Sequence, residues 1–584
     1  MANRELNPVL LPRPRSVELA PGGARVADGP VTETRDRSLK PEGYRLEVGA
    51  DGIRLLAADD GGARHGRATL AQLRRNGSGD LPGCVIDDWP DFAVRAVMLD
   101  IARDRVPTLE TLYGLIDRLA GWKLNQIQLY TEHTFAYAGH EEVWRDASPY
   151  TAAELGAIDA HCRSRGIELV ANQNTLGHFE RWLRHDRYRP LAIAPDGFEW
   201  VFGIRRSPMT LDPSKGEAFA LVSDLLSQLV PVVESRRVHI GLDEPWELAP
   251  ERHPEWLDWL KRLVALPVME GREALVWGDV LTADPALLGG IPEGVTVCEW
   301  GYEDNHPFDE RAEQLAAAGI PFWMSPGTSS WLSISGRVEN MLGNISTAAR
   351  AGLAHGAGGI LTTDWGDMGH HQQPVISEPG FATAAAFSWC QESHRSLGLD
   401  DLAQMLDVHA FEDTSSALGG ALVDLGRIPR LVTPQVPNMS ALVFQILLPQ
   451  WKVGHGATRG LSHEDLDNVE ATLAGVTTGV DRARPGRSDG DRVRDEVRAT
   501  VGLLQLAVED ARLRLDGDGS LASVGPADRA GLAEGLESVM AEHRRLWNEA
   551  FRPGGLEDSL AWFEHLGSCY QTGEADPGWF GPGT

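Results

Sequence analysis

The sequence predicts an α/β protein built on a (β/α)₈ TIM barrel, with a small α+β domain before the barrel and a helical domain after it. From residue 92 to about residue 396, short apolar runs alternate with helix-length amphipathic segments. Eight such runs can be counted, and each ends in polar or aromatic residues. A closed barrel needs eight βα units, whereas an open doubly wound sheet usually shows fewer.

The first predicted domain covers residues 1–91. A chain of 584 residues is longer than the roughly 250–300 residues at which a single core stops growing, so several domains are expected. Residues 44–48 and 53–56 have the pattern of short strands, and residues 63–73 have that of a helix. This mixture predicts a small α+β domain.

The predicted barrel covers residues 92–396. Its strand candidates are 95–101, 126–132, 168–174, 238–244, 274–280, 296–302, 321–327 and 359–365. Helix candidates follow several of them, at 109–121, 152–165, 214–233 and 338–352. Because the carboxyl ends of all barrel strands meet at one mouth, the polar residues that end these runs are expected to gather there.

The last predicted domain covers residues 397–584. Long helical patterns dominate it, among them 492–515 and 527–551, and a Gly/Asp-rich break at 516–520 separates these two. We expect this helical domain to pack against the barrel.

Composition excludes several classes of function. Lys and Arg number 54 and Asp and Glu 84, which gives a net charge of −30 that would repel nucleic acids and anionic membranes. The first residues hold no apolar run of signal-peptide length and no later run would span a membrane, so a cytoplasmic location is expected. The five cysteines never occur in CxxC spacing, which predicts buried thiols and neither a disulfide framework nor a metal site. The strands carry no dinucleotide or P-loop glycine motif, so no cofactor is expected.

Two adjacent carboxylates, Asp243 and Glu244, end the fourth predicted strand. Two acids at one mouth can divide acid and base work when their surroundings separate their pKa values. An Asp-Glu pair alone is far more often a helix cap or a solvated turn. The pair therefore needs support from its context.

Aromatic residues stand at the ends of other predicted strands. The chain has 18 tryptophans, and Trp277, Trp300, Trp331 and Trp365 stand at or just past the ends of the last four predicted strands. Any one of them alone would be read as a core residue. Together on one rim they indicate a pocket that stacks against the apolar face of a sugar ring.

With these motifs the sequence resembles the β-N-acetylhexosaminidases of glycoside hydrolase family 20, from about residue 8 to residue 395. Residues 11–17, 43–46 and 66–73 are similar to the non-catalytic N-terminal domain of that family. Residues 87–100 are similar to the entry into its barrel, and Gly241-Leu242-Asp243-Glu244 to its catalytic pair.

The resemblance implies a retaining, substrate-assisted hydrolysis without metal, in which the acetamido group of the substrate replaces an enzyme nucleophile. Glu244 would act as general acid and then as general base, and Asp243 would hold the acetamido N–H and stabilise an oxazolinium intermediate. The substrate would be an oligosaccharide or glycoconjugate with a terminal β-linked GlcNAc or GalNAc.

The resemblance also assigns residues around the sugar. Arg95 would bind hydroxyls on the non-reducing side through its forked donors, with an interdomain or surface ion pair as the alternative. His178 matches a histidine near the catalytic pair, with a structural hydrogen-bonded histidine as the alternative. Further pocket positions are matched by Glu132, Trp277, Asp279, Trp300 and Trp365.

Three positions depart from the family pattern. Trp331 stands where a tyrosine usually donates to the acetamido carbonyl, Ser333 where an aspartate is usual, and Asp367 where a glutamate usually reads the outer hydroxyls. The shorter Asp367 favours acceptance of GalNAc as well as or better than GlcNAc. His370 and His371 nearby are expected to be exposed loop residues that supply further donors at most.

Two other functions stay open. One is an exo-glycosidase that acts on another or a modified amino sugar, and the other is a non-catalytic carbohydrate-binding protein on the same fold. The intact Asp243-Glu244 pair argues against the second. The sequence also leaves open whether the chain forms a homo-oligomer.

Overall fold

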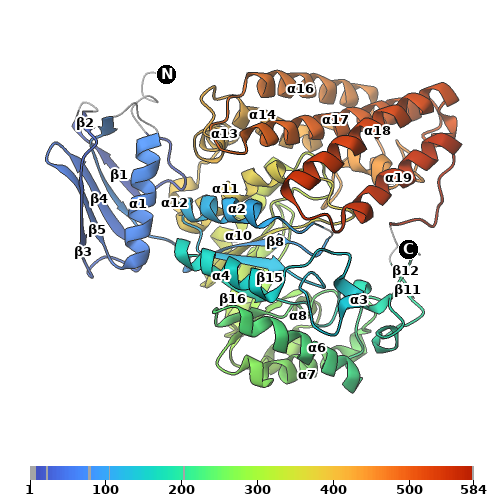
Figure 1. Cartoon of the computed structure of the whole chain (residues 1–584), viewed down its shortest axis with the longest axis horizontal. Coiled ribbons are helices and arrows are strands. Elements are labelled where there is room, and N and C mark those ends of the chain that lie inside the picture. The colour runs from blue at the N-terminus through green and yellow to red at the C-terminus, as the bar shows by residue number, and fades with distance from the viewer. Residues whose placement is uncertain (1–7, 22–23, 76–79, 104, 201–203, 582–584) are drawn as a thin grey trace.

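The computed structural model describes residues 8–21, 24–75, 80–103, 105–200 and 204–581. The outer ends of the first and last predicted domains, at residues 1–7 and 582–584, lie outside these ranges. Figure 1 shows three parts: a sheet with one helix at the N-terminal end, a central barrel, and a layer of long helices formed by the C-terminal part.

The N-terminal part is a sheet with strand order β1-β7-β4-β5-β3. Its strands are β1 (Ser16–Leu19), β3 (Val31–Arg35), β4 (Tyr44–Gly49), β5 (Gly52–Ala57) and β7 (Cys84–Asp88), beside the two-stranded pair β2 (Arg25–Ala27) and β6 (Asp80–Pro82). Alternate residues of β4 are buried, as expected for a strand with one face in a core. The helix α1 (Asp60–Arg75) lies between this sheet and the barrel (Figure 1), where the Gln72 amide donates to the Gly121 carbonyl at 3.1 Å. The predicted α+β character is confirmed.

The predicted barrel is also confirmed. Among the described residues, eight parallel strands close in the order β10-β13-β14-β15-β16-β17-β8-β9. They are β8 (Val94–Asp100), β9 (Gln126–Tyr130), β10 (Glu168–Asn172), β13 (Arg237–His239), β14 (Glu273–Trp277), β15 (Val295–Trp300), β16 (Phe322–Ser325) and β17 (Gly359–Asp364). Strand β17 pairs with β8 over six residue pairs, from Gly359 with Val94 to Asp364 with Leu99, which closes the barrel.

The strands end earlier than the apolar runs predict. The run at 238–244 predicts a strand that includes Asp243 and Glu244, but β13 ends at His239. Gly241, Leu242 and Glu244 have φ angles of 69°, 75° and 47°, which no strand allows. Asp243 and Glu244 therefore lie in the loop that follows β13, and not in the strand.

Helices surround the barrel. They include α2 (Leu109–Gly121), α4 (Ala152–Arg165), α6 (Gly216–Leu229), α7 (His253–Val264), α8 (Asp279–Ala283), α9 (Phe308–Ala317), α10 (Val338–His355) and α11 (Glu378–Trp389). Thr151 caps α4 in a reciprocal capping box with Glu154, and Gly166 ends it in the left-handed conformation. Such local signals explain why α2 and α4 have the bounds that the sequence predicts.

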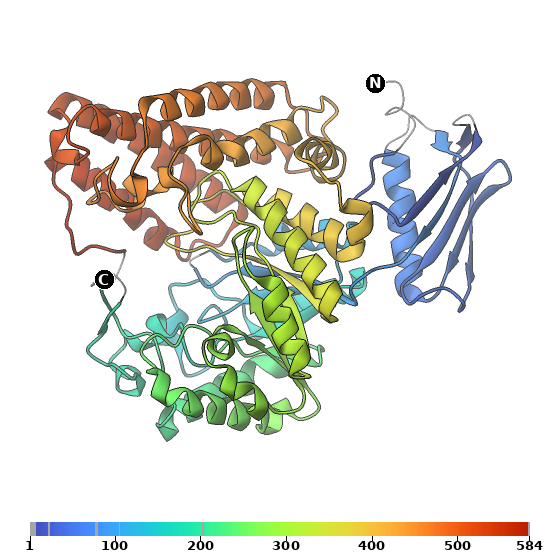
Figure 2. The same ribbon diagram turned by 180° about the vertical axis from the view of Figure 1, so that it is seen from behind.

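The C-terminal part is helical and packs along one side of the barrel, as Figures 1 and 2 show. Its main helices are α13 (Leu399–Met405), α14 (Leu418–Leu431), α16 (His463–Arg482), α17 (Gly490–Leu515), α18 (Pro526–Ala550) and α19 (Leu556–Thr572). One continuous hydrophobic core joins these helices to the outer layer of the barrel. None of the described helices has the length and apolar character needed to cross a membrane. All five cysteines are buried and unpaired, as their spacing predicts.

A separate apolar cluster fills the interior of the barrel. It contains Trp277, Trp323, Trp331 and Trp365, with Trp300 partly buried at its edge. Because the interior is packed with side chains, a ligand can enter only at the mouth, above the carboxyl ends of the strands.

Candidate functional site

A tight turn after β13 carries Asp243 and Glu244 to the mouth of the barrel. Gly241 begins this turn, and a Cβ atom on it would lie 2.3 Å from Oδ1 of Asn174. Together with the positive φ of Gly241, this contact requires glycine. Asp243 is buried and Glu244 is partly exposed, so only the second carboxyl faces the open mouth.

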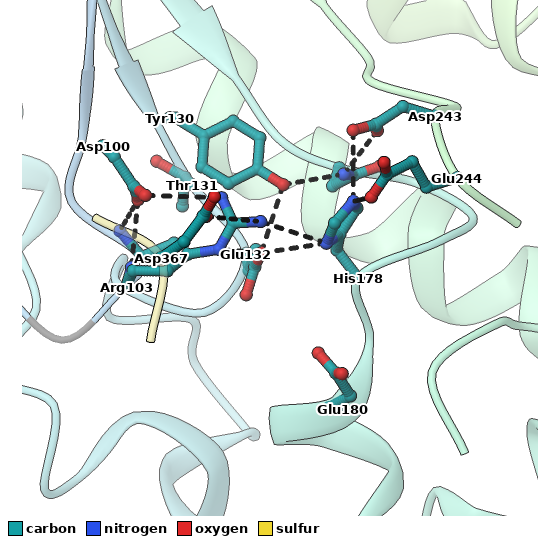
Figure 3. A network of polar contacts seen from close by, with 12 residues as sticks. Asp100, Arg103, Tyr130, Thr131, Glu132, His178, Glu180, Asp243, Glu244 and Asp367 are labelled. Carbon is teal, nitrogen blue, oxygen red and sulfur yellow. Dashed lines mark hydrogen bonds and ion pairs between the residues drawn. The ribbon is translucent and has the colours of Figure 1, made fainter. Parts of the chain in front are cut away.

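His178 lies against both carboxylates. Its Nε2 atom is 3.2 Å from Oδ2 of Asp243 and 3.4 Å from Oε2 of Glu244 (Figure 3). The preceding Gly177 permits this approach, since a Cβ atom there would lie 2.3 Å from the Asp243 carbonyl oxygen. Burial lowers the pKa of His178, but the two carboxylates more than offset burial and hold that pKa well above its usual value. The two carboxylates therefore favour the protonated form of the imidazole.

Asp243 is fixed from its other side. The amide of Asn174 donates to Oδ1 of Asp243 at 2.8 Å and to the Tyr130 hydroxyl oxygen at 3.0 Å. Burial raises the pKa of Asp243, but His178 and the Asn174 amide lower it below its usual value. Asp243 is thus an ionised carboxylate held in one orientation.

Arg103 is the arginine that the structure brings to the mouth. Its guanidinium lies 4.9 Å from the centre of the Tyr130 ring and 5.3 Å from that of Trp365, a geometry that favours cation–π attraction. Nη1 of Arg103 is 3.3 Å from Oδ2 of Asp100, and Nη2 is 3.9 Å from Oδ1 of Asp367. Figure 3 shows Arg103 beside Asp100 and Asp367, with its guanidinium directed towards Glu132 and His178.

Glu132 lies between Arg103 and His178. Its Oε1 atom accepts from the Tyr130 hydroxyl at 3.1 Å and lies 3.6 Å from both Nε of Arg103 and Nδ1 of His178. Burial raises the pKa of Glu132 to about 7, although Arg103 and His178 act in the opposite direction.

Asp279 stabilises the turn that carries Asp243 and Glu244. As the first residue of α8, it accepts the Glu244 backbone N–H at 2.9 Å and the indole N–H of Trp300 at 3.5 Å. Burial and the Asp243 charge raise the pKa of Asp279 above its usual range. Asp279 therefore positions the backbone of Glu244 and the ring of Trp300 together.

Aromatic rings form the remaining wall of the mouth. The Trp365 indole donates to the Tyr302 hydroxyl at 2.8 Å, and Tyr302 stacks on Trp300 with centroids 5.2 Å apart. Trp331 meets Tyr302 edge to face at 5.0 Å, and Trp277 lies 6.1 Å from Trp365. The indole N–H groups of Trp277 and Trp331 are buried and have no partner among the described residues.

The structure contradicts the prediction that Arg95 binds substrate. Arg95 is the second residue of β8, so it lies at the end of the barrel opposite the mouth. Its side chain is fully buried, where Nη2 donates to Oε2 of Glu42 at 2.6 Å and Nε to the Lys123 carbonyl at 2.9 Å. Arg95 therefore forms an interdomain ion pair, the alternative that the sequence left open.

The expectation that His370 and His371 are exposed loop residues is also wrong. His370 and His371 are buried, with His370 Nδ1 3.1 Å from the Arg103 carbonyl oxygen and His371 Nε2 2.9 Å from that of Ser559. Both histidines thus anchor the loop to the rest of the protein. Ser333 is buried and donates to the Ser330 carbonyl at 2.7 Å, so it serves its own loop.

Sequence reasoning missed Arg103, Tyr130, Asn174 and Tyr302 as members of the site. Arg103 had a usable signal, because it follows Asp100, the last residue of β8, by three positions and so had to lie near the mouth. The other predicted residues, Glu132, His178, Trp277, Asp279, Trp300, Trp331, Trp365 and Asp367, surround the Asp243-Glu244 pair or its aromatic wall. Among the described residues, no group of three or more His, Cys, Asp or Glu side chains is arranged to hold a metal ion.

Two family models match the sequence. The model described as "Glycosyl hydrolase family 20, domain 2" matches residues 14–89, and "Glycosyl hydrolase family 20, catalytic domain" matches residues 92–350. The catalytic-domain match includes the site from Asp100 to Trp331, and together the two matches span more than half of the chain.

Characterised proteins with similar sequences include hexosaminidases. The chain is 27% identical to a beta-hexosaminidase of Akkermansia muciniphila, over 41% of this chain and 53% of that protein. It is 25% identical to human hexosaminidase D, over 61% of this chain and 76% of that protein. The match thus spans about half of the first relative and three quarters of the second.

Solved structures share the fold. The Streptomyces plicatus N-acetyl-beta-hexosaminidase in complex with Thio-NAglucal superimposes with a TM-score of 0.55 at 19% identity, over 69% of this chain and 94% of that one. The Vibrio harveyi exo beta-N-acetylglucosaminidase in complex with N-acetylglucosamine gives a TM-score of 0.54 at 17% identity, over 72% and 77%. With its two domain matches and its closed barrel, this chain belongs to glycosyl hydrolase family 20 and carries the catalytic domain of that family.

Proposed function

We propose that this protein is a retaining exo-β-N-acetylhexosaminidase that removes terminal β-linked GlcNAc or GalNAc from oligosaccharides or glycoconjugates. One observation carries the proposal. Asp243 is buried, ionised and fixed by Asn174 and His178, while the next residue, Glu244, faces the open mouth. A retaining enzyme with its own nucleophile places two carboxyl groups on either side of the bond, about 5–5.5 Å apart. Asp243 and Glu244 are successive residues, and Asp243 is already held by protein donors. This arrangement fits a mechanism in which the acetamido group of the substrate is the nucleophile better than one in which the enzyme supplies it.

In the first step, Glu244 gives its proton to the glycosidic oxygen as the bond from that oxygen to the anomeric carbon breaks. The acetamido carbonyl oxygen of the substrate forms the new bond to the anomeric carbon, which yields an oxazolinium ion. Asp243 accepts the acetamido N–H and stabilises the positive charge that develops, a contribution that a preorganised buried carboxylate makes at little reorganisation cost.

In the second step, the Glu244 carboxylate takes a proton from water as the water oxygen attacks the anomeric carbon. The oxazolinium ring opens and restores the acetamido group, so two inversions give net retention. Glu244 is protonated again and ready for the next cycle. His178 keeps Asp243 ionised throughout because its cation lies beside that carboxylate.

The remaining side chains recognise the sugar. Trp300, which is partly exposed, and the edge of Trp365 offer an aromatic surface for its apolar face, and the buried Trp277 packs behind Trp365. Trp331 holds a buried indole N–H without a partner among the described residues, and we propose that it donates to the acetamido carbonyl. Arg103 and Asp367 lie together at the partly open side of the mouth and would bind the outer hydroxyls.

We further propose that GalNAc is accepted as well as or better than GlcNAc. Asp367 is about one third exposed, and a short carboxylate next to Arg103 leaves room for an axial 4-hydroxyl. A mismatched epimer would leave buried polar groups unpaired, at a cost of about 1–3 kcal/mol per group.

The test compares nitrophenyl β-GlcNAc, β-GalNAc and β-glucoside as substrates. We expect turnover of the two acetamido sugars, no turnover of the glucoside, and release of the β-anomer as the first product by NMR. Binding without turnover of any of them would support the carbohydrate-binding alternative. Preferential turnover of a different amino sugar would support the related exo-glycosidase.

A further inference from the structure

An exposed indole lies on the same turn as the general acid. Trp246 follows Glu244 by two residues, and its backbone N–H donates to the Glu244 carbonyl at 2.8 Å. The residue is 46% exposed, which is unusual for a large apolar side chain in this protein. By contrast, Trp277, Trp331 and Trp365 of the aromatic wall are all buried.

A second indole supports Trp246. The Trp200 and Trp246 rings meet edge to face, with centroids 6.0 Å apart and an angle of 82° between the planes. Trp200 follows β11 (Phe198–Glu199), which pairs with β12 (Arg205–Arg206), and the Arg206 guanidinium lies 5.0 Å from the centre of its ring. Trp246 thus packs against the Trp200 ring, which is itself in contact with the Arg206 guanidinium.

Glu247 fixes the acid turn to the segment that follows β12. Its Oε1 atom accepts the backbone N–H groups of Met209 at 2.8 Å and Thr210 at 3.1 Å. The turn that carries Glu244 and Trp246 is therefore tied down on both sides, since Asp279 accepts the Glu244 N–H at 2.9 Å. An exposed ring on a fixed backbone loses little freedom when a ligand stacks on it.

The chemistry of the proposed reaction decides which part of the substrate lies near Trp246. Glu244 must come within hydrogen-bond reach of the glycosidic oxygen, and the leaving group begins at that oxygen. Two residues span at most about 7 Å of backbone, so the exposed Trp246 side chain and the Glu244 side chain start from neighbouring points on one turn. The sugar that is cleaved off occupies the aromatic wall inside the mouth, which leaves Trp246 for the other side of the bond.

We propose that Trp246, supported by Trp200, is a binding surface for the sugar ring on the leaving-group side. This inference rests on the proposed function. It implies that the enzyme cleaves a terminal N-acetylhexosamine from another sugar more efficiently than from a small alkyl group. The apolar face of the second ring stacks on the exposed indole, as apolar ligand faces do on aromatic side chains in binding sites.

The experiment measures kcat and KM for two substrates with the same terminal sugar. One is N,N′-diacetylchitobiose, whose leaving group is a sugar, and the other is methyl β-GlcNAc, whose leaving group has no ring. For Trp246→Ala we expect kcat/KM on the disaccharide to fall about tenfold, mainly through KM, which corresponds to about 1.4 kcal/mol. Activity on the methyl glycoside should stay within about twofold.

Two further variants serve as controls. Trp246→Phe retains a ring and should keep most of the disaccharide activity. Trp451 is 36% exposed in the C-terminal part. Trp451→Ala therefore removes a matched exposed indole and should leave kcat/KM on both substrates unchanged. If Trp246→Ala lowers kcat/KM equally on both substrates, or on neither, the inference is wrong. If the wild type cleaves neither substrate nor any nitrophenyl N-acetylhexosaminide, the proposed function fails instead.

Discussion

The imidazole of His178 bridges two adjacent carboxylates, with Nε2 3.2 Å from Asp243 and 3.4 Å from Glu244. The bridge separates the roles of the pair. Asp243 also receives the Asn174 amide and has no freedom to move, whereas Glu244 is held at its backbone by Asp279 and keeps its carboxyl at the open mouth.

Removal of the acid should affect poor leaving groups most. In Glu244→Gln, turnover of unactivated glycosides should fall by several more orders of magnitude than turnover of dinitrophenyl glycosides, because only the former need protonation. The measurement is kcat/KM for a disaccharide and for an activated aryl glycoside. Equal losses on the two substrates would argue against Glu244 as the acid.

A thiazoline analogue of the oxazolinium ion should inhibit strongly. Transition-state and intermediate analogues bind about 10²-fold or more tightly than substrates when the enzyme is complementary to them. The comparison is the inhibition constant of GlcNAc-thiazoline with that of free GlcNAc, on the wild type and on Asp243→Asn. The variant should lose most of the advantage, and a thiazoline no better than free GlcNAc would contradict substrate assistance.

The two arginines at opposite ends of β8 should behave differently. Arg103→Lys keeps the charge but loses the planar fork, so kcat/KM should fall by about 10²-fold while the variant stays folded. Arg95→Met removes a fully buried arginine that pairs with the partly exposed Glu42 and should lower the free energy of unfolding by about 3 kcal/mol, with kcat/KM of the folded protein unchanged. Urea unfolding and steady-state kinetics on both variants check this, and a reversed pattern would restore Arg95 to the sugar site.

Glu132 should make stability depend on pH. Burial raises its pKa from 4.5 to about 7, so the folded state binds more protons than the unfolded state between these values. The contribution of Glu132 to stability is therefore greatest below pH 4.5 and is lost as pH rises through 7. Between pH 4.5 and pH 8, the wild type should lose about 3 kcal/mol more stability than Glu132→Gln. Denaturant unfolding at both pH values tests the difference, and identical pH dependence of the two proteins would rule it out.

Asp367 should set the choice between epimers. For the wild type, kcat/KM on the GalNAc aryl glycoside should equal or exceed that on the GlcNAc glycoside, and Asp367→Glu should shift the ratio towards GlcNAc because the longer side chain reaches the equatorial hydroxyl. A wild type that prefers GlcNAc more than about tenfold, or a ratio unchanged in the variant, would remove Asp367 from this role.

Much of the fold could be predicted from the sequence because its signals are local. The helices α2 and α4 have the predicted bounds because Thr108 and Thr151 cap their first turns, and because α2 ends with Gly121 and α4 is followed by Gly166. The eight apolar runs predict the eight barrel strands because each strand must bury residues on both faces. The Asp243-Glu244 pair could be placed at the mouth from its position after the fourth run.

Only the tertiary structure decided which side chains meet at that mouth. Arg95 and Arg103 both lie near the first barrel strand, but the direction of β8 carries one to the N-terminal domain and the other to the mouth. The burial of His370 likewise depends on the packing of its loop against the rest of the protein. The sequence by itself determined the barrel and the acid pair through local periodicity. Contacts between distant segments determined the arginine, the fixed orientation of Asp243 and the buried histidines, because burial and charge partners depend on residues far apart in the chain.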